Sequence, residues 1–161
     1  MATDLAPSTG RSLDQIWRSE LRSGHVDFLS IDIDGLDYRI LETLEMRPTV
    51  ICIEGGFSWH PDFRKRVPDS VAARNLQQPL SVVIDIARHK GYVPVCFNQN
   101  TFLVDQQWKD RFVDTPQDGK TLWMDAWFHR DDAFRSHLIE VRLRNRDIRE
   151  WEGNGLPALE L

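Results

Sequence analysis

The sequence predicts an α/β protein whose sheet is mostly parallel and ends in an antiparallel hairpin. An apolar strand over residues 26–31, an amphipathic helix and a second apolar strand over residues 49–53 follow one another within about thirty residues, which is the spacing of a parallel βαβ unit. Further along the chain, two short strand patterns, 92–97 and 101–104, flank an Asn-Gln-Asn turn, which is typical of a hairpin.

One helix is predicted before the first strand and another between the two strands. Ser12 and Gln15 have the pattern of a capping box, and Gly24 ends the helical pattern that follows. The apolar stripe of that helix is Leu13, Ile16, Trp17 and Leu21. In the second helix Asp37 can act as the N-cap, and Pro48 separates the helix from the next strand. Its inward-facing residues are Ile40, Leu41 and Leu44.

The connection over residues 55–78 carries no helix or strand pattern. Loops longer than about 12–15 residues are uncommon without a role, so this one is a candidate lid or substrate loop. From Pro79 an apolar helical pattern runs to Gly91. In the last third we expect a charged helix over residues 131–151, so that residues 109–161 form a helical extension.

Composition places the chain among globular proteins and argues against several classes of function. With 161 residues, 41% of them hydrophobic and 28% charged, we expect a single domain over residues 1–161, complete or partial. A net charge of −5 gives no reason to expect a nucleic acid or an anionic membrane as a partner. Since we find neither a leader pattern nor a membrane-spanning apolar run, we expect a cytoplasmic protein. Cys52 and Cys96 lie in apolar strand patterns, which favours two buried, reduced thiols.

Carboxylates follow both strands of the βαβ unit at the point where each strand ends. Asp32, Asp34 and Asp37 come after the first strand, and Glu54 ends the second. Because ligands of open α/β sheets sit outside the carboxyl ends of parallel strands, we expect these side chains to converge. Asp32, Asp34 and Asp37 are candidate ligands of a divalent cation, and one carboxylate could act as a general base. In the alternative interpretation Asp37 is only a helix cap and Asp34-Gly35 only a turn.

The long connection contributes two further candidates. His60, between Trp59 and Pro61, is a candidate catalytic base or metal ligand, and a solvated loop histidine is the alternative. The basic run over residues 64–66 could meet an anionic substrate or form a solvated face.

Several segments of the chain resemble FkbM-type methyltransferases. In chain order they are Asp27 to Tyr38, Arg47 to Glu54, His89 to Tyr92 and Asn100 to Val104. The resemblance covers residues 12–108 and depends on the order of these motifs, since each is weak alone. It implies a Rossmann-like sheet, S-adenosylmethionine as the cofactor, and O-methylation of a small molecule or sugar. It also implies that Asp32 binds the methyl donor, and that Asp34 or Glu54 accepts the proton of the acceptor hydroxyl.

The resemblance is confined to the C-terminal half of such an enzyme. These enzymes bind the donor mainly with a glycine-rich turn after their first strand, and no strand pattern here is followed by G-x-G-x-G. The N-terminal strands of the sheet therefore look absent, which leaves the strand at Val26 as an edge with unpaired backbone groups. A homo-oligomer, or a partner chain carrying the missing half, would cover that edge. The alternative functions are a non-catalytic interaction module and a partner-completed half of a methyltransferase.

A second resemblance is to haloacid-dehalogenase-type phosphatases. Asp32-x-Asp34-Gly35 after an apolar strand is similar to the start of these enzymes, in which the first Asp is the nucleophile and Mg²⁺ is bound beside it. They also need a later lysine and an acidic pair, for which Lys120 and Asp131-Asp132 are candidates. Leu36 stands where they favour threonine.

Overall fold

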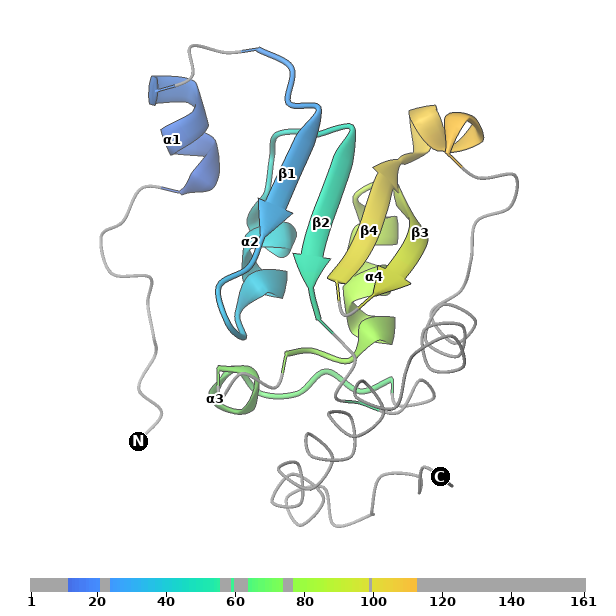
Figure 1. The fold of residues 1–161 in the computed structure, drawn as a ribbon. Coiled ribbons are helices and arrows are strands. Elements are labelled where there is room, and N and C mark those ends of the chain that lie inside the picture. The colour runs from blue at the N-terminus through green and yellow to red at the C-terminus, as the bar shows by residue number, and fades with distance from the viewer. Residues whose placement is uncertain are drawn as a thin grey trace.

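The structure, a computed structural model, contains a four-stranded sheet with two helices against one face (Figure 1). It describes residues 12–20, 24–55, 59, 64–73, 77–98 and 100–112. The predicted helix over residues 131–151 and His60 lie outside these described residues, as does all of the predicted extension beyond residue 112.

The elements follow the predicted order, with two additions. They are α1 (Leu13–Glu20), β1 (Phe28–Ile31), α2 (Asp37–Thr43), β2 (Val50–Glu54), α3 (Asp69–Ala72), α4 (Leu80–His89), β3 (Tyr92–Asn98), β4 (Asn100–Asp105) and the 3₁₀ helix η1 (Gln106–Arg111). The additions, α3 and η1, are too short to have an apolar periodicity of their own, so the sequence did not predict them.

The sheet is mixed, with the strand order β1-β2-β4-β3. β1 and β2 pair in parallel, whereas β4 pairs antiparallel with both β2 and β3. Three strands therefore run in one direction and β4 runs in the other. The sheet was expected to be mostly parallel, but only one of its three strand pairs is parallel. The predicted hairpin of β3 and β4 is confirmed. This α/β arrangement is compatible with a Rossmann-like fold.

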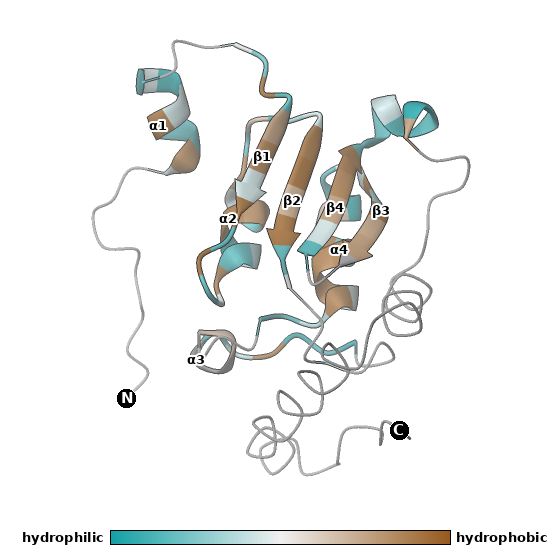
Figure 2. Ribbon diagram, viewed as in Figure 1, coloured by the Kyte–Doolittle hydropathy of each residue, from teal (hydrophilic) through white to brown (hydrophobic). Residues whose placement is uncertain are grey.

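The core lies between the sheet and helices α2 and α4, which cover the same face of it (Figure 1). The strands that contribute to it are strongly apolar (Figure 2). Ile51 and Ile53 of β2 are fully buried against Leu41 of α2 and Val83 of α4. Burial of side chains of this size contributes about 1.5–3 kcal/mol each, so this layer holds the strand ends in place.

The start of α1 confirms the predicted capping box. The Ser12 backbone N–H donates to Gln15 Oε1 at 2.8 Å, and the Gln15 N–H donates to Ser12 Oγ at 3.2 Å. Leu13 and Trp17 of this helix pack against the edge of the core, as their spacing predicts.

Two further expectations concern exposure. Cys52 is buried as predicted, but Cys96 is exposed, because it lies beyond an irregularity in the β3 register. In the part of the chain that the structure describes, no helix has the length and apolar character required to cross a bilayer.

Candidate active site

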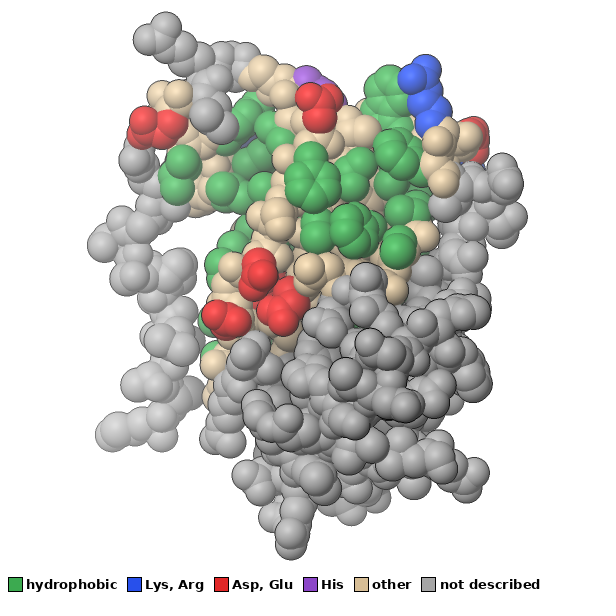
Figure 3. All heavy atoms as spheres, viewed as in Figure 1, with side chains coloured by type: hydrophobic (Ala, Val, Ile, Leu, Met, Phe, Trp, Pro, Cys, Tyr) green, Lys and Arg blue, Asp and Glu red, His purple; other side chains and the backbone are tan. Residues whose placement is uncertain are grey.

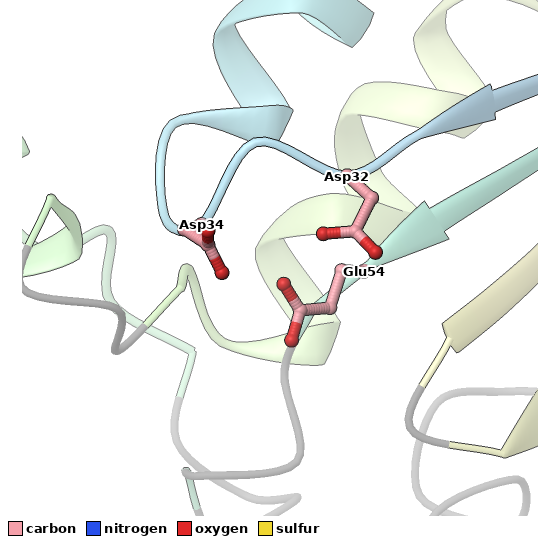
Figure 4. A group of neighbouring side chains, drawn as sticks. All are labelled: Asp32, Asp34 and Glu54. Atoms are coloured by element: carbon pink, nitrogen blue, oxygen red, sulfur yellow. The ribbon is translucent and has the colours of Figure 1, made fainter.

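The carboxyl ends of β1 and β2 bring three carboxylates together (Figure 4). Asp32 and Asp34 follow β1, and Glu54 is the last residue of β2. One oxygen of each carboxylate lies within 4.8 Å of the others. Asp32 and Asp34 are exposed and Glu54 is partly buried. The convergence of these three residues, predicted from their positions after two neighbouring parallel strands, is therefore present.

The turn after β1 has a backbone conformation that few residues tolerate. Asp34 has φ +57° and Gly35 has φ +131°. A Cβ added at Gly35 would lie 2.3 Å from the Ala72 carbonyl oxygen, so only glycine fits where α3 approaches this turn. Aspartate is among the few side chains that accept the left-handed region, which is how Asp34 can stand there. The turn interpretation of Asp34-Gly35 is thus correct, and the same turn presents the Asp34 carboxylate beside Glu54.

Asp37 does not cap α2 as predicted. It is the first residue of α2 and fully buried, and the helix has no side-chain cap bond at its N-cap, Leu36. The Asp37 carboxylate instead accepts the backbone N–H groups of Ile33 and Gly35, each at 2.9 Å. The cap prediction is therefore wrong. Both Asp37 oxygens bind the turn, and Asp37 is not among the three carboxylates whose oxygens lie within 4.8 Å of one another.

The surroundings of Glu54 perturb its carboxyl group. Burial raises its pKa, and the negative charges of Asp32, Asp37 and Asp34 raise it further. One hydrogen bond opposes this shift, because Gln77 Nε2 donates to Glu54 Oε2 at 2.7 Å. A carboxylate with a raised pKa holds a proton more readily at neutral pH, which suits a general base.

Gln77 was not identified from the sequence. Gln77 is buried and has φ +55°, and its backbone carbonyl oxygen accepts a hydrogen bond from the Trp59 indole N–H at 3.0 Å. Its neighbour Gln78 is fully buried and bonds both Val67 backbone groups, at 2.9 Å from the N–H and 2.8 Å to the carbonyl oxygen. Neither glutamine lies in a recognisable motif, so no sequence signal marked them. Together they tie the long connection to the strand that ends at Glu54.

The segment 64–73 of that connection is also anchored to α2. The Tyr38 hydroxyl donates to Asp69, and Arg39 pairs with Asp69 at 2.8 Å. Arg66 lies over the Tyr38 ring, 4.9 Å from its centroid, and pairs with Glu42 at 2.7 Å. The Arg66 guanidinium therefore binds groups of α2, and the structure gives no support at this residue for the hypothesis that the basic run meets an anionic substrate.

The three clustered carboxylates, Asp32, Asp34 and Glu54, have the oxygen atoms that a cationic ligand needs. Among the described residues, Asp32 and Asp34 have no hydrogen-bond partner, so their oxygens can approach a ligand. Carboxylate oxygens are the ligands that Mg²⁺ and Ca²⁺ prefer, and three ionised carboxylates this close repel one another. A bound cation, metal or organic, would offset that repulsion. Asp32, Asp34 and Glu54 are the residues that would hold it.

Comparisons of the chain with models of protein families, with curated proteins and with solved structures find no match. The similarity to FkbM-type methyltransferases therefore stays a prediction from the sequence.

Proposed function

We propose that this chain takes part in S-adenosylmethionine-dependent methyl transfer to a hydroxyl group of a small molecule or sugar. One observation carries the proposal. Glu54, a carboxyl group with a raised pKa, lies beside Asp32 and Asp34 at the carboxyl ends of two parallel strands. The sheet is compatible with it, since a parallel pair and an antiparallel hairpin form an α/β arrangement that fits the Rossmann-like sheet implied by the resemblance.

In this reaction Glu54 accepts the proton of the acceptor hydroxyl as the oxygen attacks the methyl carbon. The O–C bond forms while the S–C bond of the donor breaks, and the sulfonium becomes a neutral thioether. Gln77 holds the Glu54 carboxylate in one orientation through its 2.7 Å hydrogen bond. Catalysis of this kind comes chiefly from positioning the reactants in line and from proton acceptance, and the latter contributes about 10²–10⁴-fold.

The charge of the site supports a cationic donor. Asp32 and Asp34 follow the same strand and are both exposed. A sulfonium near them would be attracted by two negative charges, while the product thioether would not. We assign Asp32 to donor binding, because it is the first residue beyond β1 and lies beside Glu54 (Figure 4).

A second candidate function is Mg²⁺-dependent hydrolysis of a phosphate ester, with Asp32 as the nucleophile. The observation that favours it is the spacing of the carboxylate oxygens, all within 4.8 Å of one another. The lysine and acidic pair that such an enzyme needs, Lys120 and Asp131-Asp132, lie outside the described residues.

Calorimetric titration with S-adenosylmethionine and S-adenosylhomocysteine tests the proposal. We expect micromolar binding of the methyl donor, weakened about tenfold or more by Asp32→Asn, which corresponds to about 1.4 kcal/mol. Asp27→Asn is the matched control, because Asp27 is an exposed aspartate at the opposite end of the same strand. Absence of binding at millimolar ligand would refute donor binding by this chain.

Two further measurements separate the candidates. Glu54→Gln should retain donor binding and lower methyl transfer to hydroxyl acceptors by about 100-fold or more. Titration with MgCl₂ and an assay of p-nitrophenyl phosphate hydrolysis would instead identify the phosphatase. If neither donor nor Mg²⁺ binds, the remaining interpretations are a non-catalytic module and a half of a methyltransferase that a partner chain completes.

A further inference from the structure

The turn that carries Asp34 is held by the carboxylate of Asp37. Asp37 is the first residue of α2 and is fully buried. One of its oxygens accepts the Ile33 N–H at 2.9 Å, and the other accepts the Gly35 N–H at 2.9 Å. These two donors belong to the residues on either side of Asp34 in the chain. Hydrogen bonds to an ionised group are among the stronger ones, so this carboxylate fixes the backbone that flanks Asp34.

The same turn also lies against α3. A Cβ at Gly35 would overlap the Ala72 carbonyl oxygen, so the end of α3 touches the backbone of the turn. α3 is in turn tied to α2, because Asp69 accepts hydrogen bonds from the Tyr38 hydroxyl and from Arg39 Nε, the latter at 3.0 Å. The turn is therefore enclosed between the start of α2 and the end of α3.

Asp34 needs this support, because both its backbone and its charge are in unfavourable positions. Its φ is +57°, in the left-handed region that costs free energy for residues other than glycine. One oxygen of its carboxylate lies within 4.8 Å of oxygens of Asp32 and Glu54, and like charges this close repel one another. Asp34 is exposed, and acidic side chains gather below an apolar surface on the face of the molecule that Figure 3 shows. Without a fixed backbone, strain and repulsion would both move Asp34 away from the other two carboxylates.

We propose that Asp37 is the positioning residue of this site. Its two hydrogen bonds hold the backbone around Asp34 and so keep the Asp34 carboxylate beside those of Asp32 and Glu54. Asp37 acts through Asp34, because both of its own oxygens accept backbone N–H groups. This role rests on the proposed function in one respect, since it takes Asp34 as a charge that attracts the cationic methyl donor.

Asp14 provides a matched control elsewhere in the fold. It is also a buried aspartate, and it accepts the Met46 N–H at 2.6 Å and the Glu45 N–H at 3.1 Å. Asp37→Asn and Asp14→Asn therefore each remove one acceptor oxygen from a pair of backbone donors. A general loss of stability would affect both variants alike, whereas a loss of positioning would affect only Asp37→Asn.

Amide hydrogen exchange of the ligand-free chain tests whether Asp37 holds the turn. In the wild type, the Ile33 and Gly35 amides should exchange much more slowly than in an unstructured peptide. After correction for the measured free energy of unfolding, Asp37→Asn should accelerate one or both amides by about tenfold or more, and Asp14→Asn neither. Unprotected amides in the wild type would overturn the proposal even if Asp37→Asn does not fold. So would unchanged exchange of both amides in Asp37→Asn.

A double-mutant cycle, measured by calorimetric titration of S-adenosylmethionine, tests whether Asp37 acts through Asp34. We expect Asp34→Asn and Asp37→Asn each to weaken binding about fivefold, and Asp14→Asn to bind like the wild type. The variant with both substitutions should bind no more than about twofold more weakly than Asp34→Asn alone. Effects that multiply, to about 25-fold, would overturn the proposal, because Asp37 would then act independently of Asp34. Wild-type affinity in Asp37→Asn would overturn it as well.

Failure of the proposed function and failure of the positioning role give different results. A wild-type chain that does not bind the donor at millimolar concentration refutes donor binding, and the exchange of the Ile33 and Gly35 amides then decides alone whether Asp37 holds the turn. If the donor binds but exchange is unchanged in Asp37→Asn, the proposed function stands and the positioning role fails.

Discussion

At the scale of one residue, the ionised Glu54 side chain lowers the stability of the fold. Its raised pKa means that the native state binds the Glu54 proton more tightly than the unfolded chain does. Between the unfolded value, about 4.3, and the higher native value, stability therefore falls as pH rises, and the full penalty is present above the native pKa. Glu54→Gln removes this penalty and keeps an oxygen that can accept the Gln77 hydrogen bond.

We therefore predict that Glu54→Gln is more stable than the wild type at pH 7, and that the two converge as pH falls toward 4. Urea unfolding at several pH values measures this. Glu45→Gln serves as a control: Glu45 is an exposed residue paired with Arg18, and exposed pairs contribute at most about 1 kcal/mol. Loss of stability in Glu54→Gln at pH 7 would contradict the assigned cause of the shift.

The residues of the site were predictable from sequence only where they follow a strand directly. Asp32, Asp34 and Glu54 could be placed together because two parallel strands fix where their next residues lie. Asp37 could not be assigned correctly, since the Asp34-Gly35 pattern predicts a turn but does not say which side chain accepts the backbone N–H groups of Ile33 and Gly35. Gln77 reaches Glu54 from an irregular segment, and no periodicity reports such a contact.

At the scale of elements, Asp14 joins α1 to the end of α2. It is buried, and its carboxylate accepts the Met46 N–H at 2.6 Å and the Glu45 N–H at 3.1 Å. These are backbone donors beyond the end of α2, so one side chain of α1 fixes where the chain turns toward β2. Hydrogen bonds to charged groups contribute about 1.5–3 kcal/mol, and a buried donor left unpaired costs a similar amount.

We predict that Asp14→Ala lowers the free energy of unfolding by about 2 kcal/mol. Asp14→Asn, which keeps one acceptor oxygen, should lose less. Chemical denaturation measures both, and amide exchange at residues 45 and 46 should accelerate more in Asp14→Ala than in Asp14→Asn. Equal stability of Asp14→Ala and the wild type would mean that water replaces the carboxylate without loss.

The elements themselves were largely predictable because each carries a local signal. The capping box at Ser12, the β1-α2-β2 succession and the β3-β4 hairpin all depend on residues near one another in sequence. The position of β4 between β2 and β3 does not, because it is a pairing between segments about fifty residues apart. Local patterns give the strands but not their order, which explains why the sheet is more antiparallel in its pairs than expected.

At the scale of the whole molecule, the two tyrosines of the chain connect distant segments. The Tyr92 hydroxyl donates to the Pro48 carbonyl oxygen at 2.8 Å, and the Tyr38 hydroxyl donates to Asp69. Burial, with the negative charge of Asp105, raises the pKa of Tyr92 to about 12. Burial and the hydrogen bond to Asp69 raise the pKa of Tyr38, opposed by Arg66 and Arg39. Both phenols therefore hold their protons more tightly in the folded chain than in the unfolded one.

This linkage predicts alkaline unfolding. An unfolded tyrosine ionises near pH 10, so between pH 10 and about 12 the native state binds more protons than the unfolded state, and stability falls as pH rises through this range. We expect the ultraviolet phenolate signal to appear together with loss of the circular dichroism of the fold. Tyr92→Phe should lose about 1 kcal/mol at neutral pH with its hydrogen bond, yet show a weaker dependence on alkaline pH. Ionisation of both phenols near pH 10 in a chain that keeps its native spectrum would contradict the burial assigned to them, and with it the packing that joins these segments.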